Sequence, residues 1–87
     1  TDPASGRSLE ILTDQPGIQV YTGNYLDSSL TGKDGTTYRQ HAAICLETEC
    51  FPDAINQTEW HGEWPSGRLN PEETYKHTMV HRFTTGN

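Results

Sequence analysis

Short stretches that are mostly apolar, or that alternate apolar with polar residues at a period of two, recur along the chain, which is the pattern of β-strands. The stretches are residues 8–13, 18–21, 42–48 and 74–84. Residues 42–48 have the most buried-looking pattern, because the first five are all apolar or small. No segment keeps a 3.6-residue period over ten or more positions. The pattern therefore predicts an all-β chain.

Turn residues predict how the first two stretches connect. Residues 15–18, QPGI, place Pro and Gly as a type II turn requires, with Gly17 at a positive φ. We therefore predict a hairpin between residues 8–13 and 18–21. Its second arm has one aliphatic face, while Gln19 and Tyr21 share the other and could form the wall of a polar pocket.

Other turn signals divide the rest of the chain. Residues 32–35, GKDG, predict a turn within a loop, and residues 70–73, NPEE, predict a turn into the last strand. Residues 51–69 contain two Pro, two Gly and two Trp without a regular period. We expect this segment to be an irregular excursion on the surface.

The composition indicates a chain that is short of apolar side chains. Leu, Ile, Val and Phe make up 14 of its 87 residues, below the roughly 20% expected of a chain that builds its own core. Two Trp and four Tyr argue against disorder. We therefore interpret residues 1–87 as one segment of a larger β-sandwich domain and not as a self-sufficient domain.

The charge balance excludes several classes of partner. Six basic against twelve acidic residues give a net charge of −6, which disfavours nucleic-acid binding. No apolar run approaches the ~18 residues that span a bilayer, so we expect no membrane partner. Two cysteines are too few for a disulfide scaffold, which favours the cytoplasm. The glycosylation triplet at Asn56, NQT, would instead indicate secretion if it were used.

Two polar side chains are candidates for chemistry. Glu47 follows the apolar residues 44–46, where a carboxylate is costly unless it is solvated, hydrogen-bonded or functional. It is either a solvated charge at a strand end or a general base whose pKa partial burial would raise. Gln19 is either a water-facing amide or a group that grips sugar hydroxyls.

Other side chains offer weaker alternatives. Cys45 and Cys50 with His77 and His81 imitate a zinc site, but 26 residues separate the two pairs, against a usual gap of about 12–15. His77 and His81 on one straight strand would also be ~13 Å apart. We therefore predict no bound metal. The pair of tryptophans at positions 60 and 64 could stack on a sugar, or could cap a core.

Four separated phrases carry a family resemblance. They are residues 3–11, PASGRSLEI; 16–26, PGIQVYTGNYL; 45–53, CLETECFPD; and 64–78, WPSGRLNPEETYKHT. In this order they resemble the C-terminal portion of the aldose 1-epimerases, or galactose mutarotases. The resemblance covers nearly all of the chain.

The resemblance implies a fold, an activity and site residues. The fold would be an antiparallel β-supersandwich several times longer than this chain, with a hexose bound in a cleft on one sheet. Glu47, in the LET phrase, falls on the catalytic base, and Gln19 falls on an amide that hydrogen-bonds the sugar. The acid histidine lies upstream of Thr1, so the partners would be a hexose and the N-terminal remainder of the protein, in the same or a separate chain. No cofactor is implied.

Three departures from the family pattern bear on function. Glu49 stands where family members mostly carry Gln, which would raise the apparent pKa values of the carboxylate pair it forms with Glu47. Pro71-Glu72 replaces Pro-Gly, which predicts a type I turn. Residues 58–63 resemble a small insertion. Glu49 and the Trp-containing insertion favour an alternative function, a non-catalytic carbohydrate-binding β-module, and a zinc-held interaction module is a third.

Overall fold

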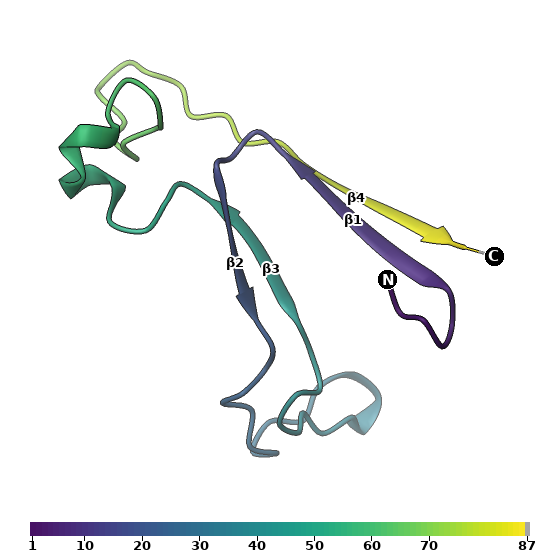
Figure 1. Ribbon diagram of the computed structural model, residues 1–87. Helices are drawn as coiled ribbons and strands as arrows, with labels where there is room; N and C mark the ends of the chain where they lie inside the picture. Colours follow the sequence, from purple (N-terminus) through teal and green to yellow (C-terminus); the bar gives the residue numbers. More distant parts are fainter. Residues whose placement is uncertain (87) are drawn as a thin grey trace. The chain divides into compact units, whose positions relative to one another are not determined.

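The computed structural model describes residues 1–86, which are built from short strands and single turns of 3-10 helix (Figure 1). No α-helix occurs within these residues. The prediction of an all-β chain with antiparallel pairing is confirmed. The elements are β1 (Arg7–Thr13), β2 (Gly17–Tyr21), η1 (Lys33–Gly35), β3 (Cys45–Glu49), η2 (Ala54–Asn56), η3 (Thr58–Trp60) and β4 (Met79–Thr85).

The strands form two separate pairs, β1 with β4 and β2 with β3. The predicted hairpin between residues 8–13 and 18–21 is therefore wrong. Gly17 is absent from the residues with positive φ, so the type II turn does not form either. An added Cβ on Gly17 would lie 3.1 Å from the Phe51 ring, so its lack of a side chain serves close packing.

The antiparallel register of β1 and β4 determines which side chains share a face of this ribbon. Residues directly opposite in an antiparallel pair share a face. Leu9 lies opposite Phe83 on one face, and Glu10 lies opposite Arg82 on the other. The Arg82 guanidinium donates a 2.7 Å hydrogen bond to the Glu10 carboxylate. The face of the ion pair also carries Leu12 opposite Val80, so apolar side chains occur on both faces of this ribbon.

The last strand begins at Met79, later than the residue 74 expected from the pattern. Its partner β1 ends at Thr13, which pairs with Met79. The backbone N–H of Thr78 donates to both carboxylate oxygens of the next residue, Asp14, at 3.1 Å each. The Asp14 backbone N–H still donates to the Thr78 carbonyl at 3.3 Å, so the carboxylate takes over only one of the two backbone hydrogen bonds at this point, and β4 begins at the next residue.

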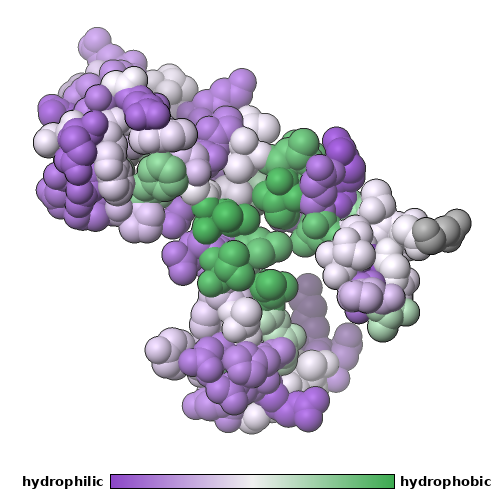
Figure 2. Space-filling model, viewed as in Figure 1, coloured by the Kyte–Doolittle hydropathy of each residue, from purple (hydrophilic) through white to green (hydrophobic). Residues whose placement is uncertain are grey.

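Very little of the described chain is buried. Ala54 is the buried apolar side chain of residues 1–86, and Figure 2 shows hydrophobic residues open to the surface. Residues 42–48 were expected to form the most buried strand, and β3 does contain a buried side chain, Thr48, although Ile44 just before it is 60% exposed. Such a chain lacks the core of an independent domain, as the composition predicted.

Close contacts group the chain into two units. One contains Thr1–Gly17 together with the residues from Thr48 onward, and the other is Ile18–Glu47. In the first, Trp60 and Trp64 pack edge-on against Phe51, with ring centroids 5.8 and 5.3 Å away. Both tryptophans therefore belong to a local aromatic cluster around η2 and η3.

The second unit contains most of β2 and β3 and the long loop that joins them. The base of this loop is held together by the His41 backbone N–H, which donates to the Gly23 carbonyl at 3.1 Å, and by the His41 ring Nδ1, 3.0 Å from the Thr22 carbonyl oxygen. Gly23 is buried and has a φ of 72°. The predicted GKDG turn is present as η1. The loop thereby tethers the adjoining ends of the two strands.

Within residues 1–86, no helix has the length and apolar character to cross a bilayer.

Candidate active site

The two predicted site residues lie on strands that pair with each other. Gln19 is the middle residue of β2 and Glu47 the middle residue of β3. The two strands run in opposite directions (Figure 1). Both side chains are exposed. Residues 28 positions apart in the sequence are thus brought onto one two-stranded ribbon.

Two glycine contacts indicate how β2 and β3 pair. At the start of β2, an added Cβ on Gly17 would lie 3.4 Å from the Glu49 carbonyl oxygen. Beyond the end of β2, an added Cβ on Gly23 would lie 3.1 Å from the Ala43 carbonyl oxygen. Both contacts fit a single antiparallel register without a bulge.

We infer from these two contacts a register that sets Gln19 opposite Glu47. Opposite residues of an antiparallel pair project from the same face, with Cβ atoms about 5 Å apart. An amide and a carboxylate on this spacing can contact neighbouring hydroxyl groups of one small polar ligand. The other face carries Ile18 and Val20, which are both about half exposed. The alternation predicted for β2 therefore separates a polar face from an apolar one.

The carboxylate of Glu47 is accessible for proton transfer. The ion pair of residues 1–86 joins Glu10 to Arg82, so no cation within this part of the chain is paired with Glu47. Of the two interpretations of Glu47 from the sequence, its exposure within the described residues agrees with a solvated charge on the strand. Glu49, two residues later, is half-buried and lies on the same side of β3.

Sequence reasoning missed the side chain next to Glu47. Thr48 is 8% exposed and is the buried polar side chain of the described chain. Its hydroxyl oxygen lies 2.7 Å from Nε2 of His77. A threonine on a strand is unremarkable in sequence, so only its partner, 29 residues later, distinguishes it.

The residues weighed as zinc ligands have other surroundings. His77 precedes β4 and contacts Thr48, while His81 is within β4 and stacks on Phe83 at 6.4 Å. Cys50 points its thiol at the Gln15 amide oxygen, 3.7 Å away. No group of three or more ligating side chains that could hold a metal occurs among residues 1–86.

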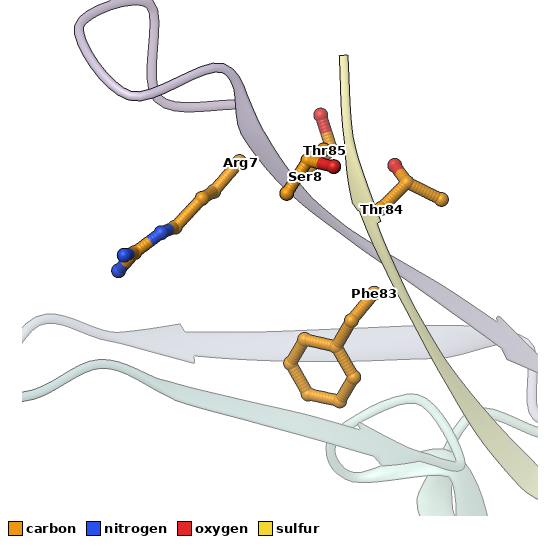
Figure 3. A pocket seen from close by; sticks show the side chains of 5 residues that line it. All are labelled: Arg7, Ser8, Phe83, Thr84 and Thr85. Carbon is orange, nitrogen blue, oxygen red and sulfur yellow. The ribbon is translucent and has the colours of Figure 1, made fainter.

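Two hollows lie away from the predicted site residues. The first, of about 280 Å³, is lined by the ends of β1 and β4, where Arg7 and Phe83 extend from the same side of the ribbon (Figure 3). The second, of about 350 Å³, lies among residues 65–69 and 74–76, together with Gln15 and Cys50. Neither hollow is lined by Gln19 or Glu47.

Comparison with known proteins gives a consistent set of relatives. The galactose mutarotase of Mus musculus is 48% identical over 81 residues, which are 93% of this chain and 22% of that protein. The galactose mutarotase of Homo sapiens is 49% identical over the same shares of the two chains. An aldose 1-epimerase of Haemophilus influenzae is 47% identical over 60 residues, 69% of this chain and 17% of that protein.

The chain therefore spans about a fifth of the length of the curated relatives that it matches. The family model of aldose 1-epimerase matches residues 1–82, which leaves only the last five residues outside the match. This extent of match, the identities above and the antiparallel β structure agree with one another. The chain belongs to the aldose 1-epimerase family.

Proposed function

We propose that the protein containing this chain is an aldose 1-epimerase that interconverts the α and β anomers of a hexose such as glucose or galactose. The observation that carries the proposal is the placement of Gln19 and Glu47 at the centres of two paired strands, both exposed, in a chain of this family. The relatives named above are a galactose mutarotase in two mammals and an aldose 1-epimerase in a bacterium.

The reaction requires a base and an acid on opposite sides of the hemiacetal. The base takes the proton of the C1 hydroxyl while the acid protonates the ring oxygen, so the C1–O5 bond breaks and an aldehyde forms. Rotation about the C1–C2 bond and reclosure give the other anomer. Nothing is oxidised or reduced, and both protons return when the ring closes.

We assign the base to Glu47. An ionised carboxylate is an acceptor with several lone-pair sites, and that of Glu47 is accessible and not neutralised by a cation within residues 1–86. Gln19, across the ribbon, supplies both an amide donor and a carbonyl acceptor for sugar hydroxyls. Holding the sugar in one orientation keeps its C1 hydroxyl in line with the carboxylate, which lowers the entropic part of the barrier.

We assign the acid to the rest of this protein, which corresponds to the relatives' sequence outside the matched segment. The matched residues are about 22% of a relative's length, and a two-stranded ribbon with so little buried surface is marginal by itself. We therefore propose that the remainder of the protein, in the same chain or a separate one, completes both the sandwich and the sugar cleft. The 87-residue segment alone is expected to be inactive.

Polarimetry of fresh α-D-glucose and α-D-galactose tests the proposal on the full-length protein. Glu47→Gln keeps the shape of the side chain and removes the base, so the rate should fall by a factor of about 10² to 10⁴. Glu49→Gln is the matched control, because it removes a carboxylate from the same face of β3. A Glu47→Gln variant with the wild-type rate would refute the assignment of the base.

The alternative function is a carbohydrate-binding β-module without catalysis. Glu49 favours it, since a second carboxylate on the same face of β3 as Glu47 alters the charge that the sugar meets. Isothermal titration calorimetry with galactose separates the two. Heat of binding without any acceleration of mutarotation by the full-length protein would support the module, whereas turnover supports the enzyme.

A further inference from the structure

A chain of hydrogen bonds begins beside Glu47 and ends near the start of β4. The Thr48 hydroxyl oxygen lies 2.7 Å from His77 Nε2 and 3.3 Å from the Met79 sulfur. On the other side of the ring, His77 Nδ1 lies 3.2 Å from the Tyr75 hydroxyl oxygen. Thr48 is thereby linked to three side chains of the C-terminal segment.

The donors and acceptors of this chain can be assigned in one direction. The single Thr48 hydroxyl proton is donated to the Met79 sulfur, so Thr48 accepts from the Nε2–H of His77. Neutral histidine has one donor and one acceptor nitrogen. In that tautomer of a neutral ring, Nδ1 accepts the hydrogen bond of the Tyr75 hydroxyl. Every proton is used once, which satisfies the buried Thr48 hydroxyl completely.

The segment that carries His77 is itself held in place. Its neighbour Thr78 donates its backbone N–H to both carboxylate oxygens of Asp14, and its carbonyl accepts from the Asp14 backbone N–H at 3.3 Å and from the Thr13 hydroxyl at 3.1 Å. His77 is therefore attached to a fixed point of the fold where no regular strand exists. The His77 ring therefore restrains the Thr48 hydroxyl to which it is hydrogen-bonded.

The peptide bond connects this anchor to Glu47. Successive side chains of a strand point to opposite faces, so Thr48 is tied down on one face of β3 while Glu47 projects from the other. A strand held at residue 48 has restricted freedom to shift or twist at residue 47. The exposed carboxylate has no ion pair of its own within residues 1–86, and the β3 backbone is the attachment to it that these residues show.

We propose that Thr48 and His77 are positioning residues for Glu47: their hydrogen bond fixes the β3 backbone so that the carboxylate meets the C1 hydroxyl in line. This inference rests on the proposed function. Neither residue contacts the sugar or donates a proton to it. The proton transfer to Glu47 thus depends on the hydrogen bond between Thr48 and His77, which forms on the opposite face of β3.

The test uses the full-length protein and three substitutions measured by polarimetry. Thr48→Val preserves the shape of the side chain and removes the hydroxyl, Thr48→Ser keeps the hydroxyl, and His77→Ala removes the ring. We expect Thr48→Val and His77→Ala to lower kcat by a factor of about 10 to 100 with KM within about twofold, because small misplacements of a catalytic group have effects of that size. Thr48→Ser should regain most of the rate.

A matched control and a pH profile separate positioning from other roles. Thr84→Val makes the same exchange on an exposed position of β4 and should leave kcat unchanged. The pH dependence of kcat/KM should keep both of its limbs in His77→Ala. A lost limb would place His77 in the proton transfer, and a rise in KM at constant kcat would place it in sugar binding; each would overturn the proposal.

The outcomes also separate this inference from the proposed function. Full activity in Thr48→Val, or equal losses in Thr48→Val and Thr48→Ser, would refute the positioning role while an inactive Glu47→Gln still upholds the base. Full activity in Glu47→Gln would refute the base whatever Thr48 does. If Thr48→Val does not fold, shown by a missing thermal transition, Thr48→Ser and His77→Ala decide the question by the same criteria.

Discussion

Glu10 and Arg82 meet across β1 and β4 at 2.7 Å, although 72 residues separate them in the sequence. Both side chains are more than half exposed. Ion pairs of this kind contribute little, because water and salt screen them. The ion pair therefore adds little to the stability of the fold.

A double-mutant cycle of Glu10→Gln and Arg82→Gln in the full-length protein should give a coupling free energy below about 1 kcal/mol. The coupling should shrink further in high salt, since screening weakens exposed charges. Urea unfolding at two ionic strengths measures it. A coupling above about 2 kcal/mol that is insensitive to salt would show that the pair is buried in the complete protein.

The turn at residues 70–73 supplies a second prediction. We expected a type I turn, which is wrong: Glu72 has a φ of 68°, the region that the third position of a type II turn requires. The Glu73 backbone N–H closes the turn by donating to the Asn70 carbonyl at 3.2 Å. A non-glycine residue therefore occupies a left-handed position on the surface, where it is strained.

Glu72→Gly should raise the free energy of unfolding by about 0.5–1 kcal/mol, because relief of strain exceeds the entropy that glycine adds to the unfolded chain. Glu72→Ala is the control, since it removes the same exposed side chain and keeps the strain. Chemical denaturation of both variants of the full-length protein is the measurement. Equal stability of the two would show that the left-handed conformation carries no strain.

Gly23, at the base of the loop between β2 and β3, gives a third prediction. It has a φ of 72°, and an added Cβ would lie 3.1 Å from the Ala43 carbonyl oxygen. Gly67 has a φ of 79° with nothing within 4 Å of an added Cβ. The left-handed φ penalises alanine at both positions, whereas the close approach of the Ala43 carbonyl penalises it only at position 23.

Gly23→Ala should therefore destabilise the full-length protein by about 1–2 kcal/mol more than Gly67→Ala does, because backbone atoms cannot move aside cheaply. The mutarotation rate should fall in Gly23→Ala alone, since the loop tethers the strands that carry Gln19 and Glu47. Thermal melting and polarimetry provide the two readouts. Indistinguishable variants would mean that the loop base adapts to the added methyl group.

Asp14 gives a prediction on pH. The backbone N–H of Thr78 and the amide of Gln15 hold the pKa of the Asp14 carboxyl below its ordinary value of 3.8, because both hydrogen bonds favour the charged form. A depressed folded-state pKa contributes stability above the unfolded pKa, and this contribution is lost as the pH falls through the folded value.

The wild-type protein should accordingly melt at a higher temperature than Asp14→Asn at pH 5–7, and the difference should shrink below about pH 4. Melting curves between pH 3 and pH 7 check both halves of the expectation. If the difference in melting temperature stays constant down to pH 3, Asp14→Asn destabilises the protein through something other than the loss of the carboxylate charge.

Several features could be read from residues alone. The alternation of Ile18 and Val20 with Gln19 correctly predicted a two-faced strand, and the low content of apolar residues predicted the lack of a core. The motif phrases identified the family, which the comparisons confirm. These features are local or compositional, so no knowledge of distant contacts was needed.

Pairing partners required the tertiary structure. Alternation determines which face a side chain occupies but not which strand lies beside it, and the turn before Gly17 predicted a neighbour that β1 does not have. Likewise, nothing near Thr48 in the sequence indicates His77, nor the Asp14 carboxylate that accepts from the Thr78 backbone N–H. Such choices depend on long-range complementarity between groups that meet only after the chain has folded, whereas strand character and family follow from short stretches of sequence.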